Sequence, residues 1–314
     1  MIKKIGKLAI LLILAIVHLL GIFWVILIFT EVGMAKNIGI QGPSLATYDF
    51  SSIPQDVMDK AAKLTAEMVG DDQELSQDFI DQLLATYLEA SDKDVLVVFN
   101  SGGWGWNMIQ ETPGWSSIID GIRVKLEQLG YSSLVVNYRR TGSGILGCLK
   151  EFAEAAARYP RKAQDLAQLV EFYTDNIPGM RVIVAGESTG TVITDETMDI
   201  LKDKPQVFSI QTGTPFWYRP TPQDRTLLMN TNGKGVDTFS YGNVPAMLWA
   251  TFKGWLGLSS PNDNPGNILS WLKAPGHDYS WQYPGVYSEV AKFLEEQFGN
   301  NESKRTQLEA PIDR

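Results

Sequence analysis

The segment that most constrains the fold is Arg181-Val-Ile-Val-Ala-Gly-Glu-Ser-Thr-Gly190. It reads as an apolar strand over 181–185 that runs through Gly186–Gly190 into a helix beginning near Thr191. A serine at such a junction sits on a strained turn, where side chains two residues before and after it would clash, so both positions need glycine. The turn lifts the Ser188 hydroxyl clear of the sheet, beside the N-terminus of the helix. The segment predicts an exposed serine nucleophile, and the alternative is an ordinary structural turn.

Apolar runs alternate with helical patterns along most of the chain. Strands are predicted over 94–100, 132–137, 181–185, 206–211, 226–231 and 268–273, and helices over 54–69, 75–90, 116–129, 145–158, 160–176, 191–202 and 286–298. This alternation predicts an α/β fold with a mostly parallel sheet and helices on both faces. In such sheets the functional residues gather at the carboxyl ends of the strands.

The N-terminus carries a second strong signal. Lys3, Lys4 and Lys7 precede an apolar run over Leu8–Thr30, which is long enough to cross a bilayer as a helix. The lysines place the N-terminus in the cytoplasm and the rest of the chain outside it. The alternative is a signal peptide cleaved near Gly33-Met34-Ala35, which would release a secreted domain.

These patterns divide the chain into four parts. Residues 1–30 are the predicted transmembrane anchor, 31–52 a linker, 53–298 the catalytic domain and 299–314 a disordered tail. Within the domain, residues 53–93 are predicted to form a helical N-terminal extension.

Charge and cysteine content exclude several classes of function. The net charge is −9, and no basic stripe interleaves with aromatic residues, so nucleic acid is not an expected partner. Cys148, the single cysteine, has no companion for a disulfide or a metal site. Gly102-Gly103-Trp104-Gly105 lacks the Gly-Lys-Ser/Thr that a phosphate-binding loop requires. We therefore expect no metal and no cofactor.

A serine nucleophile needs a base, and the chain holds two histidines. His18 lies in the predicted anchor, which leaves His277, in the turn after the last predicted strand. The base in turn needs a carboxylate between serine and histidine. Asp237 is preferred because it lies in a glycine-containing loop that follows a predicted strand. Asp263 and then Asp224 are the alternatives. Asp278 adjoins His277, and a neighbouring residue rarely reaches the ring well.

The tetrahedral intermediate of such a reaction needs hydrogen-bond donors. One predicted donor is the backbone N–H of Thr189. The other is the N–H of Gly103 or Trp104, in the glycine-rich loop after the strand that ends at Asn100.

At these residues the chain resembles the α/β-hydrolase superfamily, in its serine esterase and lipase branch. Gly186–Gly190 matches the nucleophile elbow, Gly102-Gly103 the oxyanion loop, and Ser188, Asp237 and His277 the order of nucleophile, acid and base. The resemblance covers about residues 94–298, and the missing pair of strands before residue 94 predicts a sheet shorter than the usual eight strands.

The resemblance implies an esterase that acts on a small-molecule or lipid ester. The apolar run over residues 8–30 would hold this enzyme to the membrane, with its catalytic domain outside the cytoplasm. An acyltransferase or thioesterase could use the same acyl-serine, and a non-catalytic tethered binding module is a third class. Residues 246–257 have apolar residues at helical spacing, which fits a lid, an interfacial segment or a helix packed on the sheet.

Overall fold

The computed structural model describes residues 18, 48–69, 73–105, 107–138, 151, 153–260, 265–269 and 271–299. The predicted anchor, except His18, and the predicted tail after Gly299 lie outside these residues, as do residues 31–47 of the linker and residues 145–150 and 152 of the helix predicted over 145–158. Among the described residues, no helix combines the length and the apolar character that a bilayer crossing requires.

A parallel sheet of five strands forms the centre of the described domain. The strands are β1 (Val95–Asn100), β2 (Ser133–Asn137), β3 (Arg181–Glu187), β4 (Val207–Thr212) and β5 (Thr226–Met229). They lie in the order β2-β1-β3-β4-β5, and every neighbouring pair is parallel. The predicted α/β fold is confirmed, and the sheet is shorter than eight strands in the described part of the chain. Strand β3, which carries the serine segment, is the middle strand.

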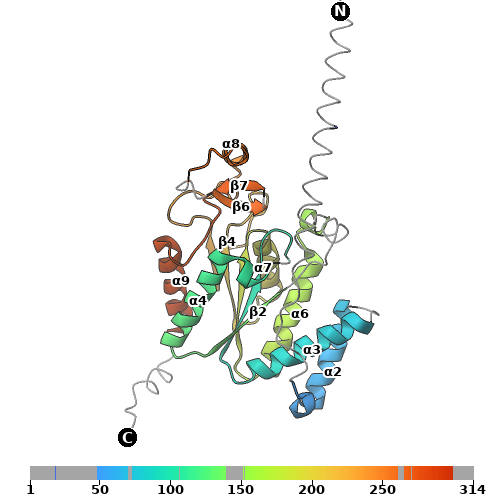
Figure 1. The fold of residues 1–314 in the computed structure, drawn as a ribbon. Coiled ribbons are helices and arrows are strands. Elements are labelled where there is room, and N and C mark those ends of the chain that lie inside the picture. The colour runs from blue at the N-terminus through green and yellow to red at the C-terminus, as the bar shows by residue number, and fades with distance from the viewer. Residues whose placement is uncertain are drawn as a thin grey trace, which may run out of the picture.

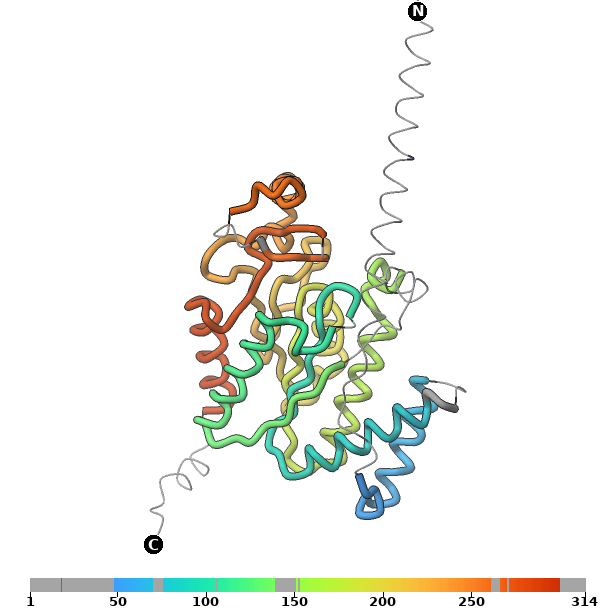
Figure 2. Tube along the Cα trace, viewed as in Figure 1, coloured from blue at the N-terminus to red at the C-terminus, as the bar shows by residue number. Residues whose placement is uncertain are grey.

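Helices cover both faces of the sheet (Figure 1). Helices α4 (Pro113–Gln128) and α9 (Pro284–Phe298) pack on one face, and α6 (Pro160–Asn176) and α7 (Thr189–Ile200) on the other. Helices α2 (Gln55–Val69) and α3 (Gln73–Ala90) pair with each other outside α6 (Figure 2). Two short 3-10 helices, η2 (Phe50–Ser52) and η3 (Ile109–Glu111), complete this layer structure. Residues 50–52, assigned above to the linker, thus already have regular structure.

The apolar runs form strands because their side chains fill two cores at once. Every residue of β1 is buried. Val95, Val97 and Phe99 pack toward α4 and α9, whereas Leu96 and Val98 pack toward α6 and α7. A strand whose two faces are both covered must be apolar at every position, and this explains the continuous run.

The prediction of a sixth sheet strand over 268–273 is wrong. These residues belong to an antiparallel hairpin of β6 (Pro265–Leu269) and β7 (Leu272–Pro275), separate from the main sheet. Leu269 pairs with Leu272, so the chain reverses inside the predicted strand. Antiparallel strands need only a two-residue connection, and Ser270 and Lys273 interrupt the continuous apolar surface that a central strand would need.

Helix α8 (Val244–Trp255) packs on this hairpin, at the carboxyl-end side of the sheet (Figure 1). It corresponds to the helical pattern predicted over 246–257. Met247 on α8, Phe239 and Ala274 on β7 form a small core of their own. Residues 236–260, 265–269 and 271–275 thus lie over the end of the sheet where functional residues were expected.

The close packing of α4 on the segment before α9 gives a stability prediction. A Cβ atom at Gly121 would lie 2.1 Å from the Trp281 ring, so Gly121→Ala should destabilise the domain by about 1–3 kcal/mol in denaturant titrations, despite the better helix propensity of alanine. Gly254→Ala in α8 is the matched control, because its Cβ would meet side-chain atoms of Lys273 and Ser259 at 3.7 Å, which is ordinary van der Waals contact. Equal effects of the two substitutions would contradict this packing.

Candidate active site

Ser188 occupies the junction between β3 and α7 in a backbone conformation that few non-glycine residues adopt. Its φ is 51° and its ψ is −120°. A residue held there costs on the order of 1–3 kcal/mol, and such strain persists only where the surroundings enforce it. The two flanking glycines are required, as predicted. A Cβ at Gly186 would lie 2.7 Å from Thr194 Oγ1, and one at Gly190 would lie 2.3 Å from the carbonyl oxygen of Asn100.

The structure brings His277 to this serine. His277 follows β7, and its Nε2 lies 3.1 Å from Ser188 Oγ. The ring packs edge-on against Phe239, with centroids 5.0 Å apart. On another side Gly213 approaches so closely that a Cβ there would lie 2.6 Å from His277 Cε1. The imidazole is therefore fixed by the loops that follow β4, β5 and β7.

The structure also brings Asp237 to His277. Asp237 is completely buried in the loop after β5, and its Oδ2 lies 2.8 Å from His277 Nδ1. An ionised carboxylate can only accept hydrogen bonds, so Nδ1 carries the proton and Nε2 is left to accept the hydrogen of the Ser188 hydroxyl. Ser188, His277 and Asp237 thus form one continuous chain of hydrogen bonds.

Four further donors hold the Asp237 carboxylate. Oδ1 accepts from the backbone N–H groups of Phe239 at 2.9 Å and Ser240 at 3.1 Å. Oδ2 accepts from Ser240 Oγ at 3.0 Å and from the hydroxyl of Tyr279 at 2.7 Å. Burial by itself would raise the pKa of Asp237, but its hydrogen bond and charge interaction with His277, together with the bonds from Tyr279 and Ser240, bring that pKa below its ordinary value. Burial and the adjacent carboxylate raise the pKa of Tyr279, which keeps its hydroxyl a donor.

The two rival acids that the structure describes, Asp278 and Asp224, lie elsewhere. The Asp278 carboxylate accepts hydrogen bonds from Asn232 Nδ2 and the Tyr283 hydroxyl, so it points away from the imidazole beside it. Asp224 is exposed, before β5. Asp263 lies outside the described residues.

The predicted oxyanion loop is bound directly to the serine turn. The N–H of Gly102 donates to the Glu187 carboxylate at 3.1 Å, and the Thr189 hydroxyl donates to the carbonyl oxygen of Gly103 at 2.8 Å. Asn100 Nδ2 donates to the carbonyl oxygen of Gly190 at 2.9 Å. These three bonds hold Gly102 and Gly103 against Glu187 and Thr189, in a tight turn where Gly103 has a φ of +57°.

Several supporting residues were not predicted from the sequence. Tyr279 and Ser240 hold the acid, while Glu187 and Asn100 hold the loop to the turn. Glu187 is the first variable residue of the G-x-S-x-G pattern, and Tyr279 stands two residues after His277. Their closeness in sequence to Ser188 and His277 is the signal by which they could have been found. Of the aromatic residues near the site, Trp115 is a core residue, 1% exposed, whose Nε1 donates to Thr212 Oγ1 at 3.0 Å. No group of three potential metal-binding side chains occurs in the described parts of the chain.

Comparisons with known proteins add little to this geometry. No protein-family model matches the sequence, and no curated protein matches it at a significant level. Among solved structures, the chain is similar to a Trichoderma reesei cutinase in complex with a C11Y4 phosphonate inhibitor. The sequences are 12% identical, the match covers 79% of this chain and 93% of the cutinase chain, and the TM-score is 0.42. At this identity and TM-score the match does not identify a family for this chain.

The bonding of Asp237 gives a pH-dependent stability prediction. At neutral pH, Asp237→Asn should lower the free energy of unfolding by about 1–3 kcal/mol, because an amide cannot satisfy all five donors. Since the pKa of Asp237 is lower in the folded state than its ordinary value of 3.8, its ionisation stabilises the fold above that pH. The stabilisation is lost as the pH falls through the folded-state pKa. Urea titrations from pH 7 to pH 3 should therefore show the gap between wild type and variant narrowing at the acid end. A gap that stays constant would contradict this account of the carboxylate.

Proposed function

We propose that this chain is a membrane-anchored serine hydrolase that cleaves carboxylic esters through an acyl-serine intermediate. The observation that carries the proposal is the unbroken hydrogen-bond chain from Ser188 Oγ through His277 to Asp237. A hydroxyl, an imidazole and a buried carboxylate in this order form the arrangement that activates serine in acyl transfer, and it is recognised by geometry and not by sequence position.

In the first half of the proposed reaction, Ser188 Oγ attacks the ester carbonyl while His277 Nε2 takes the hydroxyl proton. Asp237 holds the imidazole in the required tautomer and stabilises the imidazolium that forms. The negative charge that develops on the carbonyl oxygen is assigned to the backbone N–H of Thr189, at the start of α7, and to that of Gly103 or Trp104. His277 then gives its proton to the leaving alcohol, and the acyl group stays on Ser188.

The second half repeats these steps with water as the nucleophile. His277 takes a proton from water, the hydroxide attacks the acyl-serine, and His277 returns the proton to Ser188 Oγ as the acid leaves. An acyltransferase would differ only in replacing water by another acceptor, and a thioesterase only in its leaving group. Both remain alternatives for the same residues.

A non-catalytic binding module is a weaker alternative. The strained Ser188 backbone and the burial of the Asp237 carboxylate both cost free energy that other contacts must offset. A module without catalysis has no use for either feature. Ser188 and His277 are 4% and 7% exposed, so they contribute almost nothing to the surface that a binding module would present to a partner.

The cellular location is proposed on the sequence alone. The run over residues 8–30 is long enough for a membrane helix, and the lysines before it favour a cytoplasmic N-terminus. The domain that follows would then act outside the cytoplasmic membrane, and a cleaved signal would export the same domain. Ester substrates there can be dissolved molecules or lipids.

Labelling with a fluorophosphonate probe tests the nucleophile. We expect covalent labelling of Ser188, and none in Ser188→Ala or His277→Ala, because only an activated hydroxyl attacks the phosphorus. Ser259 is the internal control, since it is exposed whereas Ser188 is almost covered. The peptide that carries the label is identified by mass spectrometry. Labelling of Ser188→Ala to the wild-type level would refute the assignment.

Ester hydrolysis by two asparagine variants tests the acid. Asp237→Asn should lower kcat by roughly 10⁴-fold, because the amide stabilises the wrong tautomer of His277 and cannot stabilise the imidazolium. Asp263→Asn, the control at the rival position, should leave kcat within about threefold of wild type, as expected for a residue outside the catalytic unit. The reverse order of effects would transfer the role to Asp263.

A further inference from the structure

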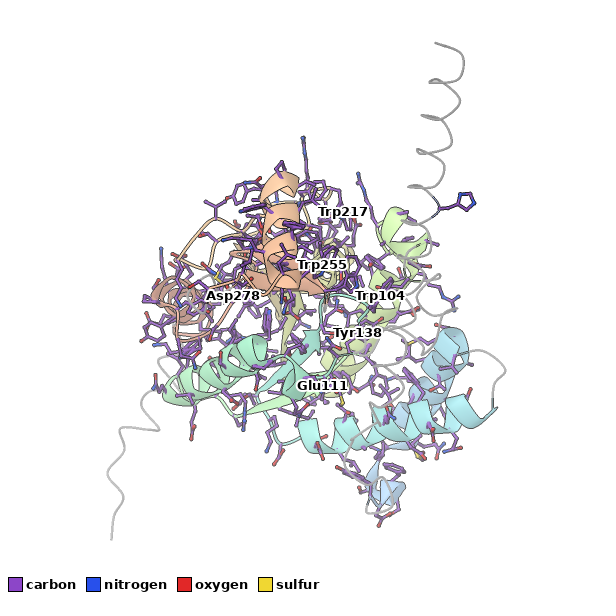
Figure 3. All side chains as sticks on the ribbon, turned by 45° about the horizontal axis from the view of Figure 1, so that its top comes forward. Trp104, Glu111, Tyr138, Trp217, Trp255 and Asp278 are labelled. Atoms are coloured by element: carbon purple, nitrogen blue, oxygen red, sulfur yellow. The ribbon has the colours of Figure 1, made fainter. Side chains whose placement is uncertain are left out.

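Helix α8 exposes an unusual number of large apolar side chains. Of the fifteen large apolar residues that are exposed in the described parts of the chain, seven lie on or just after this helix. Their exposed fractions run from 43% to 64%, and we call them the α8 patch: Val244, Leu248, Trp249, Phe252, Trp255, Leu256 and Leu258. Figure 3 shows α8 lying across the carboxyl-end face of the domain, with Trp255 on it. Contiguous apolar surface of this kind marks an interaction site.

The patch is the outer face of a helix whose inner face is already packed. Met247 and Thr251, one turn apart, are 7% and 4% exposed, and they face the hairpin. The backbone N–H of Lys273 on β7 donates to Thr251 Oγ1 at 3.0 Å. Residues 248, 249, 252, 255 and 256 follow at helical spacing on the other side. Docking by the inner face therefore holds the patch outward.

The charge around the patch differs from that of the chain as a whole. The chain carries a net charge of −9, yet no aspartate or glutamate occurs from Thr238 to Asn262. Lys253 is the ionisable side chain within α8, between Phe252 and Trp255. Tryptophan, leucine and lysine without acids form the composition that lies in the interface of a bilayer with anionic lipids.

The segment between the predicted anchor and the domain is long enough to let helix α8 reach the bilayer. The linker between the predicted anchor and the described domain, residues 31–47, has 17 residues and spans up to about 56–61 Å when extended. A domain of this size is about 45 Å across. The tether is therefore long enough for α8 to meet the membrane that the anchor enters.

We infer that the α8 patch docks on the surface of a lipid bilayer, with Trp249, Phe252 and Trp255 entering the interface. The docked orientation would turn the active-site end of the domain toward the membrane. The hairpin links the two, because a Cβ at Gly103 would lie 3.7 Å from the carbonyl oxygen of Ile268 on β6, while β7 carries α8. The inference uses the predicted anchor but not the catalytic roles of Ser188 and His277.

Photocrosslinking of the full-length chain in lipid vesicles tests the docking. Benzoylphenylalanine replaces Phe252 in one variant and Val124 in the control, in vesicles of phosphatidylcholine with phosphatidylglycerol. The two positions match in exposure, 49% and 53%, but Val124 lies toward the C-terminal end of α4, near the amino ends of the strands. We expect the lipid adduct at position 252 to exceed that at 124 by roughly tenfold or more, since only α8 would enter the interface.

The result should be the same in a Ser188→Ala background, which separates docking from catalysis. Equal lipid adducts at 252 and 124 would overturn the inference, as would the absence of lipid adducts at 252. Crosslinks from position 252 to a second protein chain would show that α8 covers another copy and not a bilayer. Failure of the full-length chain to float with the vesicles would also overturn it, because the membrane would then not be held near α8.

Discussion

The geometry of the candidate site depends on one buried carboxylate. Asp237 accepts five hydrogen bonds from its own loop and from the segment that follows β7. Removing a carboxylate from water costs several kcal/mol, and without these donors it could not stay ionised in a site with no solvent contact. Because His277 and Tyr279 are two of the donors, the same bonds that stabilise the charge also fix the loop that carries the imidazole. The hydrogen bonds that stabilise the buried charge therefore also align the imidazole with Ser188.

Close backbone packing holds Ser188 in its strained conformation. Its positive φ is held because Gly190 presses against the carbonyl oxygen of Asn100, and Gly102 against Ser188 Cβ. Neither contact leaves room for a side chain. The predicted oxyanion loop and the serine turn thus pack tightly at the ends of two adjacent strands, β1 and β3, which are aligned by the pairing of Asn100 with Gly186.

The sequence predicted the parts of this site that depend on local chemistry. A glycine-flanked serine between an apolar strand and a helix indicates a tight turn from the local sequence alone. The chain has only two histidines, and one of them lies in the predicted anchor, so the candidate base is His277. The acid was harder, because three aspartates stand between Ser188 and His277 in plausible loops, and a tertiary contact selects one. Tyr279 and Glu187 carry no local signature, since their roles arise only when distant loops meet. The prediction of one strand over 268–273 fails because a short apolar run does not reveal whether it pairs with the central sheet or folds back into a hairpin, as β6 and β7 do.

The most direct test of the central claim is a rapid-quench measurement with a p-nitrophenyl ester in excess over the enzyme. If Ser188 forms an acyl intermediate, nitrophenol should appear in a burst close to one equivalent per chain, and the Ser188 peptide should gain the mass of the acyl group during that burst. A burst would be missing if the acyl-serine were hydrolysed faster than it forms. A carbamate ester covers that case, because a carbamyl group on Ser188 is hydrolysed slowly and the adduct accumulates. Turnover of the ester with no adduct on Ser188 under trapping conditions, or with the adduct on another residue, would contradict the account.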